Sequence, residues 1–447
     1  LFYCWVNIYH RVASYSKPYT MKWHRYLIIL ILVTGLRGIS GVVVDSLVVK
    51  GNQITRYNII AREVSHPIPA EFDSAVARLD RNRVYNMGIF ESVAIYPLED
   101  SGVVYLVVEV IESFRMLPLP LFYYQDDVGW SYGGAASYRN FRGLNQQLLL
   151  SATLGGEKTY RIVFSDPWLF GDRIAMFGQA GRTYRGHATY DFRHMIQIFE
   201  LGLGKASSDN TFIAAGTFNV QQREVKWSDL TGPGTPDGPR RQLNHHFAHI
   251  RFSLLWRTTD IWRDPTRGAQ LGVAVSTTQG LDDPSPSYNN LIWEAAWFRA
   301  LTDRTTPLVL GIGLKWTYYD RDTPVYLHQF IGRKWVRGYS PVPGENHEKV
   351  RGRLEKTSVA NIAFELRRTL IPRTVWYQVA VGLSGVLFVD HAWGYGPDAP
   401  LAEAMPVTGF GAGLRLFLPF IELLAFDIGT NRYDYKLHYI WGISHKF

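Results

Sequence analysis

Residues 308–318 read Leu-Val-Leu-Gly-Ile-Gly-Leu-Lys-Trp-Thr-Tyr, and this alternation decides the fold. Large apolar or aromatic side chains take every second position, with small or polar residues between them. Because successive side chains of a β-strand point to opposite faces, one face of this segment is apolar and the other is not. The same pattern recurs at 248–257 and 409–418. Polar faces of Gly, Arg, Gln and Ser, opposite apolar faces that end in Trp and Tyr, are typical of strands that contact lipid on one side.

In lipid every backbone polar group needs an internal partner, and a closed barrel leaves no free sheet edge. Residues 115–447 accommodate some sixteen strands at about ten residues per strand plus turns. The composition agrees, since 40 Gly, 26 Tyr, 24 Phe and 14 Trp accompany a mean hydropathy of only −0.09. Downstream of residue 40 there is no run of about 20 apolar residues, the length a membrane helix needs. We predict a transmembrane antiparallel β-barrel of about 16 strands over residues 115–447.

The formal charge of +8 comes from Lys and Arg residues that are scattered along the chain. Because nucleic-acid binding calls for a dense basic patch or a known motif, we expect no nucleic-acid partner. A barrel lumen or a lipid headgroup surface explains scattered arginines at least as well. The only cysteine is Cys4, which excludes a disulfide scaffold and a cysteine-ligated zinc.

Residues 1–40 are predicted to be an upstream leader followed by a signal peptide. Met21 precedes the basic residues Lys22 and Arg25, then an apolar run at 27–33, then small residues at 38–41. These are the three regions of a secretory signal peptide. The alternative is a membrane anchor, but about ten apolar residues are too few to span a bilayer.

Residues 42–112 predict a small α+β domain in the order β-α-α-β-β. An apolar first strand ends at the turn Gly51-Asn52, two helices follow, and strands at 92–97 and 103–111 close the unit. With Tyr85-Asn86-Met87-Gly88-Ile89-Phe90 before the second strand, it resembles a polypeptide-transport-associated (POTRA) domain. The resemblance implies a periplasmic domain that binds an unfolded or extended client polypeptide by strand addition. A plug or spacer without a client remains the alternative.

The last segment alternates as well, with Tyr439, Trp441, Ile443 and the terminal Phe447 on one side. It resembles the C-terminal signal of bacterial outer-membrane proteins, which implies that the barrel assembly machinery is a partner during biogenesis. His445 departs from the apolar residue usual at that position.

Four short motifs occur in order within the predicted barrel. They are Tyr-Arg-Asn-Phe-Arg-Gly at 138–143, Ser-Asp-Pro-Trp-Leu-Phe-Gly at 165–171, Asp-Pro-Thr-Arg-Gly at 264–268 and Val-Arg-Gly-Tyr at 336–339. Together, from about residue 42 to the terminus, the chain resembles the bacterial surface antigen family. This is the outer-membrane protein assembly factor superfamily, which includes the BamA and TamA factors and the two-partner secretion transporters.

The resemblance places Val336, Arg337, Gly338 and Tyr339 at the tip of a long loop folded into the barrel, where the arginine meets acidic residues of the inner wall. The alternation of faces along a strand supplies two candidates, one in a strand predicted over residues 357–368 and one in the next strand, whose apolar face begins at Val375. Ile362, Phe364 and Leu366 form an apolar face, so Glu365 points inward, and by the same rule Asp390 points inward from the next strand. Burial of an arginine away from water costs free energy unless the charge is paired. Its guanidinium can donate two parallel hydrogen bonds to one carboxylate. We predict that Arg337 pins the loop to Glu365 or Asp390; the alternative is an arginine in an external loop.

No enzyme signature stands out, and we predict no catalytic residues, no cofactor and no metal. His245, His246 and His249 could offer ligands, although histidines of this kind more often line a loop or lumen. Gly382-Leu383-Ser384-Gly385 lacks the G-x-S-x-G spacing of a nucleophile elbow, and no phosphate-binding loop is present.

The leading functional prediction is a barrel in the bacterial outer membrane, in contact with its lipid, that inserts or translocates polypeptides without nucleotide hydrolysis. The alternatives are a passive pore, a structural or anchoring barrel with a POTRA docking domain, and the membrane anchor of a separately encoded enzyme.

Overall fold

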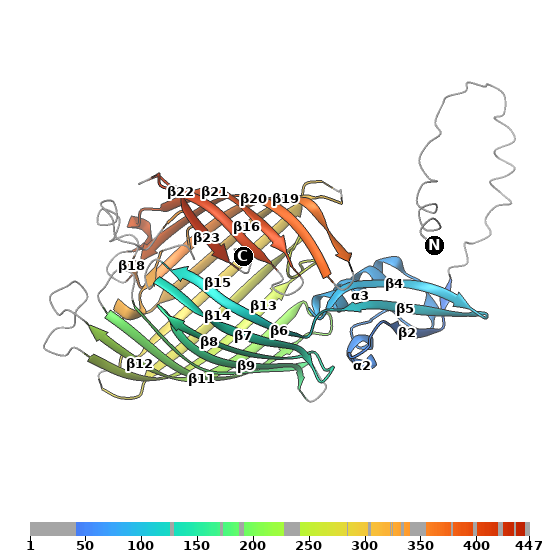
Figure 1. The fold of residues 1–447 in the computed structure, drawn as a ribbon, viewed down its shortest axis with the longest axis horizontal. Coiled ribbons are helices and arrows are strands. Elements are labelled where there is room, and N and C mark those ends of the chain that lie inside the picture. The colour runs from blue at the N-terminus through green and yellow to red at the C-terminus, as the bar shows by residue number, and fades with distance from the viewer. Residues whose placement is uncertain are drawn as a thin grey trace, which may run out of the picture.

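The computed structural model describes residues 42–442 except 126–128, 170–172, 187–191, 228–241, 284, 303–304, 322, 324, 332–334, 340–354, 377–378, 397–399, 419–422 and 433–434. A small N-terminal domain lies against one end of a β-barrel (Figure 1). The predicted signal peptide at 1–40 and the terminal residues Ile443 and Phe447 lie outside the described residues. Among the described residues, no helix is both long and apolar enough to cross a membrane.

Within the described part of the chain, one antiparallel sheet of 16 strands forms the barrel, which confirms the predicted fold. Each strand pairs with the strand next to it in the barrel order, and β16 pairs directly with β19. The strands are β6 (Met116–Gln125), β7 (Gly129–Phe141), β8 (Gln146–Gly155), β9 (Lys158–Leu169), β10 (Ile174–Gly186), β11 (Phe192–Ala206), β12 (Phe212–Trp227), β13 (Gln242–Arg257), β14 (Gly268–Gly280), β15 (Tyr288–Ala300), β16 (Leu308–Tyr319), β19 (Ser358–Trp376), β20 (Val379–Tyr395), β21 (Val407–Phe417), β22 (Leu424–Asn431) and β23 (His438–Gly442).

The alternation read from the sequence sets which face of each strand meets lipid. Phe252 and Leu254 of β13 and Leu387 of β20 are exposed on the outside, whereas Glu365 of β19 and Asp390 of β20 are buried. An isolated carboxylate inside a protein is costly, so the inward acids require partners. The long segment between β16 and β19 provides them.

The N-terminal domain contains a three-stranded sheet with strand order β2 (Ser46–Lys50), β5 (Val103–Glu112), β4 (Phe90–Asp100). The helices α2 (Tyr57–Ala61) and α3 (Ser74–Asn86) pack on it, and β1 (Val43–Val44) pairs with β3 (Ala70–Glu71). Asp73 caps α3 by accepting hydrogen bonds from the backbone of Ala75 and Val76. Apolar side chains of the helices and sheet fill the core: Ile60, Val84, Phe90, Val93 and Val108.

One strand boundary differs from the prediction. The sequence pattern suggested a strand ending near residue 368 and another beginning near 375, but β19 continues to Trp376 and β20 begins at Val379. The ladder between them is irregular at Thr369–Ile371 and again at Ile371–Thr374. Such bulges shift the alternation by one residue, and this explains why the apolar pattern misplaced the turn.

Candidate functional site

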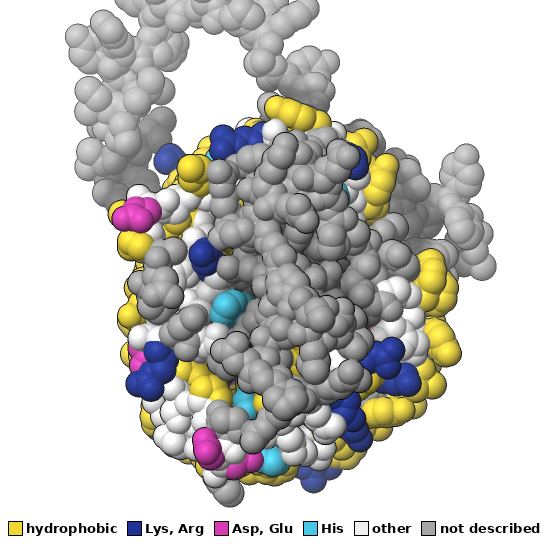
Figure 2. Space-filling view, turned by 90° about the vertical axis from the view of Figure 1, so that its left-hand side faces the viewer, with side chains coloured by type: hydrophobic (Ala, Val, Ile, Leu, Met, Phe, Trp, Pro, Cys, Tyr) yellow, Lys and Arg dark blue, Asp and Glu magenta, His cyan; other side chains and the backbone are white. Residues whose placement is uncertain are grey.

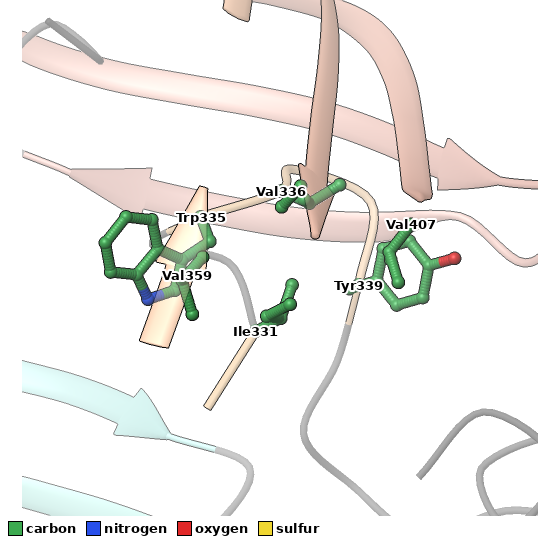
Figure 3. Close-up of a cluster of buried hydrophobic side chains, with 7 residues drawn as sticks. Ile331, Trp335, Val336, Tyr339, Val359 and Val407 are labelled. Carbon is green, nitrogen blue, oxygen red and sulfur yellow. The ribbon is translucent and has the colours of Figure 1, made fainter. Parts of the chain in front are cut away.

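The described part of the loop between β16 and β19 folds into the barrel, and its Val-Arg-Gly-Tyr segment is buried. Trp335, Val336 and Tyr339 pack with Ile331 of the loop and with wall residues of β19, β20 and β21: Val359, Ala392 and Val407. Figure 3 shows Trp335 near Val359 and Tyr339 near Val407. This apolar packing holds the loop backbone against the inner wall on both sides of Arg337.

Arg337 is 3% exposed and forms a forked contact with Asp390. Its Nε and Nη2 atoms donate to the two carboxylate oxygens at 2.8 and 2.7 Å, and its backbone N–H donates to the same carboxylate at 2.9 Å. Nη1 donates to Glu365, and the guanidinium lies 3.9 Å from the centre of the Phe388 ring. The structure therefore brings Arg337 together with both predicted carboxylates.

Two further residues, which the sequence analysis did not single out as partners, complete this group. Arg415 of β21 donates to both carboxylate oxygens of Asp427 of β22 at 2.6 and 3.1 Å. Asp427 also lies 3.7 Å from Arg337, and Arg415 lies 3.8 Å from Glu365. We call the set of Arg337, Glu365, Asp390, Arg415 and Asp427 the buried ion cluster.

The buried ion cluster combines two cations with three carboxylates in a site that excludes water. Burial by itself would lower the pKa of the Arg337 guanidinium, but the hydrogen bonds to Asp390 and the charge of Glu365 raise that pKa above its ordinary value. Arg337 stays charged, and each carboxylate has at least one cationic neighbour. The arrangement can hold a loop in place, but it has no nucleophile or general base aimed at an open space.

Two glycines of the wall leave room for the loop backbone. A Cβ added to Gly409 of β21 would lie 1.9 Å from the carbonyl oxygen of Arg337, and one added to Gly429 of β22 would lie 2.9 Å from the Gly338 nitrogen. Gly338 itself has φ +97°, and its carbonyl accepts a hydrogen bond from Asn431 Nδ2 at 2.8 Å. A side chain at any of the three glycines would separate the loop from the wall.

The same loop has a second contact on the other side of the lumen. Tyr326 and Leu327, in the short 3-10 helix η1 (Val325–Leu327), pack against inward residues of β11 and β12: Phe192, Val225 and Trp227. The Tyr326 hydroxyl contacts His245 Nδ1, and the Tyr326 ring lies 5.7 Å from the His194 ring. The loop thus reaches both sides of the barrel interior.

The histidines considered as metal ligands have separate surroundings. His245 contacts Tyr326, whereas His249 Nδ1 lies 2.8 Å from Thr278 Oγ1. His246 points to the opposite face, where its Nδ1 lies 2.6 Å from Asp282. Among the described residues, no group of three or more histidine, cysteine or acidic side chains is arranged to hold a metal ion.

The segment Tyr85-Asn86-Met87-Gly88 of the N-terminal domain contacts the turn between β13 and β14. Asn86 Nδ2 donates to the Asp260 carbonyl at 3.2 Å, and Asn86 Oδ1 accepts from the Trp262 N–H at 3.1 Å. Arg263 Nη2 donates to the Gly88 carbonyl at 2.7 Å. Gly88 has a φ of +78°, a backbone conformation that favours glycine, and a Cβ there would lie 2.3 Å from the mobile end of the Arg263 side chain.

Two of the other motifs lie at the same junction. Trp168 of the 165–171 motif receives the Arg62 guanidinium 3.7 Å from its ring centre. Asn140 Nδ2, from the 138–143 motif, donates to Thr55 Oγ1 at 2.8 Å. Both contacts join the end of a barrel strand to the N-terminal domain, a role that spacing along the chain did not reveal.

The 264–268 motif links this junction to the inner wall. Arg367 of β19 approaches Asp264 at 3.2 Å and donates to the Pro265 carbonyl from inside the barrel. Arg367 lies two residues beyond Glu365, so both side chains point inward from one strand. Strand β19 therefore contacts the loop through Glu365 and the domain-facing turn through Arg367.

The predicted C-terminal signal is described only in part. Tyr439 of β23 is exposed, and its ring stacks with Phe426 at a centroid distance of 6.3 Å. Trp441 pairs with Phe426 in the β22–β23 ladder.

A sequence profile of the Omp85 superfamily domain matches residues 140–447. The chain belongs to the Omp85 superfamily. This match includes the buried ion cluster and all but two residues of the first motif. As a member of this superfamily, the protein is a barrel of the bacterial outer membrane.

Solved structures share the fold at low sequence identity. BamA from Haemophilus ducreyi lacking POTRA domains 1–3 is 15% identical, with a TM-score of 0.53 over 90% of this chain and 84% of that one. CdiB from Acinetobacter baumannii is 13% identical, with a TM-score of 0.54 over 89% and 72%. CdiB from Escherichia coli is 12% identical, with a TM-score of 0.55 over 91% of both chains. A comparison with curated protein sequences finds no match.

Proposed function

We propose that this Omp85 protein inserts or translocates polypeptides at the bacterial outer membrane without nucleotide hydrolysis. In this proposal the N-terminal domain is a POTRA domain in the periplasm, and the barrel provides either a passage or a site of membrane entry. The observation that supports it is the loop held across the lumen by the buried ion cluster.

The client would bind as an added strand on the N-terminal sheet. Among the described residues, β2 and β4 are the outer strands of that sheet, and each presents backbone groups along its free side. Such edges bind extended chains through main-chain hydrogen bonds, with little demand on the client sequence. Client binding and folding would supply the driving force.

Strand addition can be tested by photo-crosslinking on the full-length protein. A crosslinking residue placed at exposed Lys50, at the end of β2, should capture a denatured outer-membrane client. The same residue at exposed Arg78 on α3 is the matched control, because a helix offers no free backbone edge. Equal capture at both positions would contradict strand addition.

Depletion in the native bacterium, followed by quantitative proteomics of the outer membrane and the medium, tests the activity. Loss of several barrel proteins supports insertion, whereas loss of one exported protein supports secretion. If neither changes while planar bilayers show a stable conductance, the protein is a passive pore and the proposal is wrong.

A further inference from the structure

The outward face of β9 to β12 carries basic side chains near the end of the barrel remote from the N-terminal domain. Lys158 of β9, Arg182 of β10, Arg193 of β11 and Lys226 of β12 are all exposed. We call these four residues the basic rim. Figure 2 looks onto this end of the molecule, where dark-blue Lys and Arg side chains gather along stretches of the edge.

The ladder registers show that the basic rim is on the lipid-facing side. Arg182 pairs with Tyr160 of β9 and with Gln197 of β11, and these pairs continue the rows that contain the exposed apolar residues Ile162 and Phe199. Side chains two residues apart on a strand share a face. Arg182 therefore points outward, like the lipid-facing side chains below it.

Arg182 borders the apolar belt, and Arg193 lies farther toward the remote end. On β11 the outward positions read Leu203, Leu201, Phe199, Gln197, Met195 and Arg193 toward the remote end, and Met195 is buried. Arg193 is four residues beyond Gln197, about 13 Å along the strand at roughly 3.3 Å per residue. This change from apolar to basic side chains is where hydrocarbon gives way to headgroups.

The basic rim carries more positive charge than its acidic neighbour neutralises. Glu224 forms an ion pair with Lys226 at 2.7 Å, and it neutralises that one cation. Among the described residues, Lys158, Arg182 and Arg193 have no ion pair. Some other outward positions at this end of the barrel carry aromatic residues, such as Trp130 and Tyr132 of β7 and Tyr318 of β16.

We propose that the basic rim binds the phosphate groups of anionic lipid headgroups in the leaflet remote from the N-terminal domain. Arg182 would donate to a phosphate from its forked guanidinium, with Gln197 beside it as a neutral donor. Tyr160 lies at the level of the apolar boundary and supports the same depth. Lipid binding by the basic rim requires only that the barrel is embedded in a membrane. It is therefore independent of the proposed polypeptide-handling function.

Native mass spectrometry of the full-length protein in detergent, titrated with diphosphorylated lipid A, tests the site. Each removed cation should weaken binding roughly fivefold, so Arg182→Gln with Arg193→Gln should weaken it on the order of 25-fold. The matched control is Arg78→Gln with Arg81→Gln on α3, which removes the same charge from exposed positions outside the barrel. The control should bind lipid A like the wild type.

Equal lipid affinity in the wild type and the rim variant would overturn the proposal. Displacement of the lipid by an equal concentration of inorganic phosphate would also overturn it, because the site would then be one for free anions. Should the double variant fail to fold, Arg182→Gln alone is expected to lose about fivefold in affinity, and an unchanged affinity would overturn the proposal.

Discussion

Arg337 forms contacts that no other residue type can reproduce. Its side chain forks to Asp390, reaches Glu365 and lies on the face of Phe388, while its backbone also donates to Asp390. Removal of one partner from a buried ion pair leaves an uncompensated charge, which costs more than the intact pair contributes. The loop position therefore depends strongly on this residue.

Arg337→Ala is expected to lower the free energy of unfolding by about 3–5 kcal/mol, because Glu365 and Asp390 lose their shared cation. Arg337→Lys keeps the charge but not the fork, so we expect a smaller loss of about 1–3 kcal/mol. The temperature at which the folded barrel converts to the unfolded form on a denaturing gel measures both. Arg321→Lys is the control, since Arg321 is 61% exposed and only 3.8 Å from Asp320.

Replacement of Asp390 and replacement of Glu365 are predicted to destabilise the barrel by different amounts. Asp390 accepts three hydrogen bonds from Arg337 and Glu365 accepts one, so Asp390→Asn should destabilise the barrel more than Glu365→Gln. A double-mutant cycle of Arg337→Ala with Asp390→Asn should give a coupling energy of about 1–3 kcal/mol. A coupling near zero would show that Arg337 acts without Asp390.

At the scale of elements, the wall glycines decide how closely the loop approaches. Gly409→Ala would place a methyl group 1.9 Å from the Arg337 carbonyl, so the loop must move away from β21 while the strand persists. We expect a larger single-channel conductance in planar bilayers. Gly134→Ala in β7 is the matched control, because its added Cβ would meet nothing closer than 3.7 Å. An unchanged conductance in Gly409→Ala would mean that the loop does not limit ion flow.

Alternation fixes the face of each strand, so it predicted the barrel and the inward direction of Glu365 and Asp390. That these carboxylates meet Arg337 was expected from the resemblance to the family. The same alternation indicates that Arg415 of β21 and Asp427 of β22 both point inward. Alternation does not show which of the many inward residues lie at the same level along the barrel axis. That level depends on the register between strands around the barrel. The bulges at residues 369–374 also hid the end of β19.

At the scale of the whole molecule, the turn between β13 and β14 and the end of β19 hold the N-terminal domain through polar contacts. Arg263 binds the Gly88 carbonyl, and Arg373 Nη1 donates to the Tyr85 hydroxyl at 2.6 Å. Arg263→Ala with Arg373→Ala should loosen the domain without unfolding the barrel. Spin labels at Arg78 and Arg299 should then give a broader distance distribution than in wild type. Arg321→Ala is the control, and an unchanged distribution in the double variant would assign the docking to other contacts.

The same junction is predicted to depend on pH. Burial raises the pKa of the Tyr85 hydroxyl above its usual value of 10, although the nearby Arg373 acts in the opposite direction. The docked state therefore favours the protonated phenol. The protonated Tyr85 phenol contributes fully to docking below pH 10, the pKa of a free phenol. This contribution is lost as the pH rises through the raised pKa. The spin-label distances should broaden as the pH rises above 10 in wild type, and this change should be absent in Tyr85→Phe.

The buried ion cluster has one more carboxylate than cations, so the ion selectivity of the lumen depends on the position of the loop. With the loop in place, Arg337 and Arg415 face Glu365, Asp390 and Asp427. If the loop leaves, Arg337 goes with it, and three carboxylates line the lumen beside one arginine. Permeation would then favour cations. The reversal potential in a salt gradient would thus report, molecule by molecule, whether the passage is occupied by its own loop or cleared for a client.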